Sequence, residues 1–104
     1  MVNKEVLNVQ KRNGRGTEPL NIEKIHEMVE YACEDISGVS SSQVEMNSGL
    51  QFYDGMTTDE IQQILIKSAS DLISLDNPNY QYVAARLLLY SLRKQIFRRL
   101  WDHP

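Results

Sequence analysis

Three positions in this 104-residue chain could bind an anionic ligand. Lys11 and Arg12 adjoin the Asn13-Gly14 turn, where backbone amides can also contact an anion. Thr58 stands near the predicted start of a helix, whose N–H groups and dipole favour negative charge. Lys94 lies late in the last predicted helix. The pattern indicates phosphate binding. The alternatives are a solvated hairpin tip for the first pair and, for Lys94, a charge that complements a helix C-terminus.

Few residues could support catalysis or bind a metal ion. His26 and His103 are far apart and match no recognised metal-ligand spacing. Cys33 is the only cysteine, which excludes an internal disulfide and any zinc site built on a cysteine pair. Neither a G-x-x-x-x-G-K-[ST] loop nor a G-x-G-x-x-G turn is present. We therefore expect no catalytic residue and no protein-bound structural metal.

Charge is segregated along the chain, although the formal net charge is only -3. Residues 1–17 carry four basic residues and one acid, and residues 77–104 carry five basic residues and one acid. The stretch between them carries two basic residues and 12 acids. Such runs are commonly solvated helix faces. The functional alternative is that the two basic ends converge on an anionic ligand.

Length and composition predict a single domain over residues 1–104. A hydrophobic content of 41% argues against disorder, and no apolar run approaches the roughly 18 residues of a membrane-spanning helix. The first residues lack the apolar stretch and cleavage site of a secretory signal. We therefore expect a cytoplasmic location and no membrane partner.

The predicted fold class is α+β, mainly α, with a small N-terminal β-hairpin or sheet that caps a four-helix cluster. The hairpin is expected over about residues 5–20, with room for one further short strand. Apolar residues then recur at helical spacing. The helices are expected over about residues 22–36, 40–49, 58–75 and 78–100.

Local signals predict where these helices begin. Asn21 is a good N-cap, and Thr57 with Glu60 has the spacing of a capping box, as has Ser40 with the glutamine three residues on. Pro78 fits the first position of the last helix. Residues 83–90 of that helix are apolar on most sides, which predicts a buried central helix.

Five segments, in order, form a pattern that covers nearly the whole chain. They are Val9-Gln-Lys11-Arg12-Asn-Gly14, Glu18-Pro-Leu-Asn21-Ile-Glu-Lys24-Ile25, Gln51-Phe-Tyr-Asp-Gly55-Met-Thr-Thr58-Asp-Glu-Ile61, Pro78-Asn-Tyr-Gln-Tyr-Val-Ala-Ala-Arg86 and Leu92-Arg-Lys94. These segments resemble the pattern of an ATP-cone domain. The combination resembles the N-terminal activity-control cone of class I ribonucleoside-diphosphate reductase large (alpha) subunits.

The resemblance implies an allosteric regulatory domain of an oxidoreductase, without catalytic machinery of its own. In that family the cone binds ATP, which keeps the reductase active, or dATP, which inhibits it, and so controls deoxyribonucleotide synthesis for DNA replication. The implied effector is ATP or dATP, with Mg²⁺. The implied partners are the rest of the large subunit and the small, radical-generating subunit, and nucleic acid is not expected. The alternative is a helical interaction or DNA-binding regulatory module without nucleotide specificity.

The resemblance also assigns roles position by position. Lys11 and Lys94 match phosphate-binding lysines, and Thr58 matches a phosphate-contacting threonine. The segment that holds adenine and sugar matches Glu18, Pro19, Leu20, Asn21, Ile22, Glu23 and Lys24. The residues that match the pocket lining are Val9, Arg12, Ile25, Ile61 and Gln62.

Overall fold

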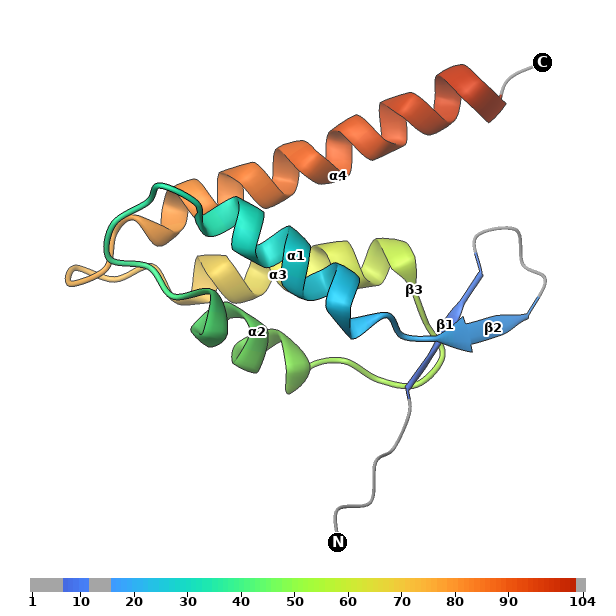
Figure 1. The fold of residues 1–104 in the computed structure, drawn as a ribbon, viewed down its shortest axis with the longest axis horizontal. Helices are drawn as coiled ribbons and strands as arrows, with labels where there is room; N and C mark the ends of the chain where they lie inside the picture. Colours follow the sequence, from blue (N-terminus) through green and yellow to red (C-terminus); the bar gives the residue numbers. More distant parts are fainter. Residues whose placement is uncertain (1–6, 12–15, 103–104) are drawn as a thin grey trace, which may run out of the picture.

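The computed structural model describes residues 7–11 and 16–102, with side chains as far as Lys94. Helices make up most of this part of the chain, and a small sheet lies at one end of them (Figure 1). This arrangement confirms the predicted α+β, mainly α class. The elements, in chain order, are β1 (Asn8–Gln10), β2 (Thr17–Pro19), α1 (Ile22–Cys33), α2 (Ser41–Gly49), β3 (Met56–Thr57), α3 (Thr58–Asp71) and α4 (Tyr80–Asp102).

The sheet joins the N-terminal hairpin to the start of α3. Strand β1 is central, antiparallel to β2 and parallel to β3, so that Val9 lies opposite both Glu18 and Met56. The turn before β3 is fixed to β1, because the Gly55 N–H donates to the Asn8 carbonyl at 2.8 Å. Gly55 has φ +88°, a conformation that glycine adopts without a steric penalty. The predicted Asn13-Gly14 turn lies outside the described residues.

The core forms between the facing sides of the four helices, and Val9 and Met56 of the sheet close one end of it. On α1 the buried residues recur at helical spacing, and α4 packs across both α1 and α3 (Figure 1). The buried hydrophobic residues are Val9, Ile25, Met28, Val29, Ala32, Val44, Met56, Ile61, Leu65, Ala69, Tyr80, Val83, Ala84 and Leu87.

The predicted caps are largely confirmed. The Asn21 side chain accepts a hydrogen bond from the Lys24 N–H at 3.1 Å and caps α1. Thr57 and Glu60 form both halves of a capping box at the start of α3. At the start of α2, the Ser40 hydroxyl accepts from the backbone N–H three residues on, which is half of the predicted box. These caps are predictable because they depend on residues close together in the chain.

Several helix ends differ from the prediction. Helix α1 ends at Cys33 instead of residue 36, because Asp35 takes a left-handed conformation with φ +62° that a helix cannot continue through. Helix α3 ends at Asp71 instead of residue 75, where Leu72 closes it with bonds to Ala69 and Ser70 carbonyls. Helix α4 begins at Tyr80, so Pro78 lies in the preceding turn and not at the first helical position.

The prediction that residues 83–90 form a buried central helix is wrong. Helix α4 lies on the outside of the cluster, with α1 and α3 on one side of it (Figure 1). Leu88 and Leu89 on its outer side are exposed, Leu89 by 52%. Within the described residues, none of the helices is long and apolar enough to cross a membrane.

Candidate functional site

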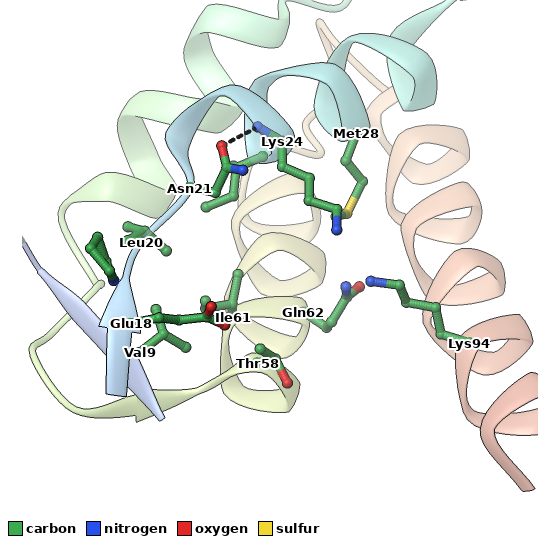
Figure 2. A pocket seen from close by; sticks show the side chains of 12 residues that line it. Val9, Glu18, Leu20, Asn21, Lys24, Met28, Thr58, Ile61, Gln62 and Lys94 are labelled. Carbon is green, nitrogen blue, oxygen red and sulfur yellow. Dashed lines mark hydrogen bonds between the residues drawn. The ribbon is translucent and has the colours of Figure 1, made fainter. Parts of the chain in front are cut away.

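A cavity of about 280 Å³ opens where the sheet meets α1, α3 and α4 (Figure 2). It is close to the lower end of the roughly 300 to 1,000 Å³ typical of small-molecule sites. Apolar side chains alternate around it with lysines, an acid and amides. The lining residues are Val9, Glu18, Pro19, Leu20, Asn21, Lys24, Ile25, Met28, Thr58, Ile61, Gln62 and Lys94.

The hairpin and the first turns of α1 form one side of the cavity. Strand pairing places Glu18 of β2 opposite Val9 of β1, which is buried. The Asn21 cap fixes the start of α1, so that Lys24 and Ile25 lie on the helix face next to the sheet. Figure 2 shows the Lys24 side chain directed along this face towards the middle of the cavity. The arrangement brings Glu18, Asn21 and Lys24 to a wall whose other side chains are apolar.

The start of α3 forms the floor. Thr58, Ile61 and Gln62 recur at three- and four-residue spacing and so share one face of the helix. The capping box holds this end in place, because the Glu60 carboxylate accepts from the Thr57 N–H at 2.9 Å and also from the Tyr53 hydroxyl. The Tyr53 bond first, and the Thr57 N–H second, lower the pKa of Glu60. The first turn of α3 therefore faces the cavity as a fixed helix N-terminus.

Lys94 reaches the cavity from α4. Its ammonium lies 5.4 Å from the centre of the Tyr90 ring, a cation–π distance, and Figure 2 shows it directed towards Gln62. Because α4 continues to Asp102, Lys94 lies well before the last turn, where a helix dipole acts most strongly. The C-terminal dipole therefore explains this lysine poorly.

Gln62 is the most unusual residue in the lining. Its side chain is only 6% exposed, although it is polar. Its Oε1 is the single buried side-chain N or O atom without a hydrogen-bond partner among the described side chains. Buried polar groups are nearly always paired, and an unpaired one is a common mark of a site that a ligand completes.

The structure gathers most of the predicted site residues around this cavity, but not all. Lys11 is exposed at the end of β1 and does not line the cavity. Its backbone N–H donates to the Gly16 carbonyl across the hairpin at 2.9 Å. Ile22, 67% exposed, and Glu23 point elsewhere, because the helical rotation turns them away from the face shared by residues 21, 24 and 25. Arg12 lies outside the described residues.

One lining residue was not predicted. Met28 follows Lys24 by one helical turn on α1, so the periodicity that placed Lys24 could have identified it. Among the described residues, the cations that line the cavity are Lys24 and Lys94, and Lys11 is not one of them. Because Arg12 lies outside the described residues, the convergence of the two basic ends on one ligand stays a prediction.

Comparison with known proteins shows the family of this chain. A family model described as the ATP cone domain matches residues 7–95. The chain is 53% identical over 91 residues to ribonucleoside-diphosphate reductase 1 subunit alpha of Salmonella typhimurium, covering 88% of this chain and 12% of that protein. It is 48% identical over 102 residues to the Escherichia coli protein of the same name, covering 93% of this chain and 13% of that protein.

A third relative is ribonucleoside-diphosphate reductase subunit alpha of Helicobacter pylori. The chain is 48% identical to it over 91 residues, covering 88% of this chain and 11% of that protein. The chain thus spans only about an eighth of the length of these relatives. The family match runs through every lining residue of the cavity, from Val9 to Lys94, and this chain belongs to the ATP cone domain family.

Proposed function

We propose that this chain is an allosteric nucleotide-binding domain of a ribonucleoside-diphosphate reductase alpha subunit, activated by ATP and inhibited by dATP. The observation that carries the proposal is the cavity itself. In a chain of the ATP cone family, Lys24 and Lys94 converge on a space bounded by the N-terminus of α3. Cations and a helix N-terminus together complement a polyphosphate.

The two ends of the cavity differ in chemistry, and this difference supports one orientation of the nucleotide. The phosphates would lie between Thr58 and Lys94, where the helix N-terminus and an ammonium meet. The base and sugar would lie along residues 18–24, against the apolar side chains of Val9 and Ile25. Backbone and amide groups there can bond the ring nitrogens and ribose hydroxyls.

A nucleoside triphosphate would extend beyond a cavity of about 280 Å³. Lys11 remains in the proposal as an outer contact, since the exposed end of β1 adjoins the cavity wall formed by Val9. Arg12 remains only on the strength of the resemblance. Ile22 and Glu23 are kept only as members of the segment that surrounds the base. Their side chains would contribute to nucleotide binding only at the solvent-exposed rim of the cavity.

Mg²⁺ would arrive with the triphosphate. Among the described residues, Glu18 is the only carboxylate that lines this cavity, which is too few for a protein-built magnesium site. Mg²⁺ usually keeps several waters and binds through substrate phosphates. The donor set therefore suits an ion held by the phosphate oxygens and water.

The regulatory output would pass to other parts of the enzyme. We propose that the partners are the rest of the alpha subunit and the small, radical-generating subunit, in the cytoplasm, and that neither a membrane nor nucleic acid takes part. ATP and dATP would act by different affinity for two arrangements of these partners, because a ligand shifts an equilibrium only through such a difference.

Calorimetric titration with ATP, dATP and GTP tests the proposal. We expect saturable binding of ATP and dATP, and we expect Lys94→Ala to weaken both roughly tenfold or more, since a bond between charged groups is lost. Lys67→Ala is the matched control, because Lys67 is exposed on α3 and pairs with Asp71 at 2.8 Å, outside the cavity. Absence of ATP and dATP binding at millimolar concentration would refute the proposed function.

A further inference from the structure

The unpaired oxygen of Gln62 indicates a missing hydrogen-bond donor. Gln62 lies one helical turn after Thr58 on the cavity face of α3, and its side chain is more than nine-tenths buried. Its Oε1 is inaccessible to water and has no partner among the described residues. An acceptor in this state costs free energy, so it needs an explanation, such as a hydrogen bond that forms in another state of the protein.

The chemistry of the oxygen narrows the choice of partner. An amide oxygen accepts hydrogen bonds and donates none, so it cannot bind phosphate oxygens directly. Its partner must carry N–H or O–H. Figure 2 shows the ends of Gln62 and Lys94 directed towards one another, from α3 and α4, which pack side by side. Lys94 is thus the donor that the geometry favours.

We propose that Gln62 is a positioning residue for Lys94. On this inference, which rests on the proposed nucleotide-binding function, Gln62 Oε1 accepts a hydrogen bond from Lys94 Nζ when nucleotide is bound. An ammonium has three N–H donors, so it can bond Oε1 and phosphate oxygens at the same time. The contact between the ammonium and the Tyr90 ring is made through the face of the ring and uses no acceptor lone pair.

Two consequences distinguish a role of Gln62 in positioning Lys94 from a role in packing alone. The effect of Gln62 on affinity should pass through Lys94 and should vanish when that ammonium is absent. It should also be independent of the sugar, because ATP and dATP carry the same phosphates. A nucleotide could instead bring a ribose hydroxyl or the adenine amino group to the oxygen. A bond to the 2′-hydroxyl would make the effect depend on the sugar, and a bond to the adenine amino group would persist without the Lys94 ammonium.

A double-mutant cycle measured by calorimetry tests the inference. The variants are Gln62→Met, Lys94→Met and the double variant, each titrated with ATP and with dATP. Methionine keeps the length of glutamine and removes the acceptor. We expect Gln62→Met to weaken ATP and dATP equally, by about fivefold, and to change affinity less than twofold in the Lys94→Met background. Gln63→Met, the same change on the exposed side of α3, is the control and should leave affinity unchanged.

Two results would overturn the inference while leaving the proposed function intact. One is an effect of Gln62→Met that persists undiminished in the Lys94→Met background. The other is a loss confined to ATP, which would assign Oε1 to the ribose 2′-hydroxyl. If the wild-type chain binds neither nucleotide, the proposed function fails first.

A measurement that needs no change at Gln62 keeps the inference testable if the Gln62→Met variants do not fold. The NMR signals of the Gln62 side-chain amide should shift when ATP is added. They should shift much less in Lys94→Met at saturating ATP. An equal shift in both proteins would overturn the inference.

Discussion

His26 and Glu45 form an ion pair that ties α1 to α2. The His26 Nδ1 lies 3.0 Å from both carboxylate oxygens of Glu45. The hydrogen bond to Glu45, and then its charge, raise the pKa of His26 above its ordinary value of 6.5. A pKa that is higher in the folded state means that protonated His26 favours folding. This contribution is complete below pH 6.5 and is lost as the pH rises through the folded-state pKa.

The stability difference between the wild type and His26→Gln should therefore depend on pH. We expect the variant to be less stable at about pH 5.5 and to approach the wild type at about pH 8.5, measured by urea unfolding. The difference should be small, because the His26 side chain is 54% exposed and solvent screens the pair. Glu45→Gln should lower the pKa of His26 in an NMR titration. A difference in stability that is the same at both pH values would contradict the assignment.

Two adjacent threonines at the start of α3, Thr57 and Thr58, have different roles in this helix. Thr57 ends β3 and caps the helix, with its hydroxyl 3.1 Å from the Glu60 N–H. Thr58 is the first helical residue and lines the cavity. The cap fixes where the helix begins, and this in turn determines which side chains face the ligand. Stability and binding are thus assigned to neighbouring residues.

Thr57→Ala should destabilise the chain by about 1 kcal/mol, the usual cost of losing an N-cap hydroxyl. Thr58→Ala should change stability by no more than about 0.5 kcal/mol, because it removes no cap. Urea unfolding of both variants measures these changes in stability. Calorimetry should show that Thr58→Ala weakens ATP binding. Equal losses of stability in the two variants would show that the capping box does not hold α3.

Elements set by nearby residues could be predicted from the sequence, and those set by distant contacts could not. The Asn21 and Thr57 caps follow from side chains within three residues of the helix start. Strand β3 is only two residues long and exists because it pairs with β1, far away in the chain. The outward face of α4 was also missed, since an apolar segment does not reveal how many neighbours will cover it.

The same distinction applies to the candidate site. The segment from Glu18 to Lys24 is assigned to the site through its resemblance to the ATP cone, and all of it except Ile22 and Glu23 lines the cavity. Lys11 could not be excluded from the lining, since that depends on where the end of β1 lies relative to α3 and α4. The unpaired oxygen of Gln62 leaves no mark in the sequence, because it results from packing in three dimensions.

The cavity depends on the packing of most elements of the molecule, because its walls come from the sheet, α1, α3 and α4. A nucleotide that binds only this folded arrangement should stabilise it by mass action. At 100 times its dissociation constant the gain is about 2.7 kcal/mol. For a domain of this size we expect ATP to raise the unfolding midpoint by roughly 10 °C or more.

Thermal unfolding with and without ATP measures this shift. Lys94→Ala at the same ATP concentration should show a smaller shift, because its dissociation constant is higher. An equal shift in Lys94→Ala and the wild type would mean that ATP stabilises the chain from somewhere other than this cavity.

The walls of the cavity also determine when it can first exist during synthesis. Val9 belongs to the first strand and Lys94 to the last helix, so the two ends of the lining are separated by most of the chain. A nascent chain that has left the ribosome only as far as α3 lacks the Lys94 wall, and pairing of β1 with β3 must await translation of Met56 and Thr57. Because such distant contacts form late, the nucleotide can act only on finished domains and cannot guide their early folding.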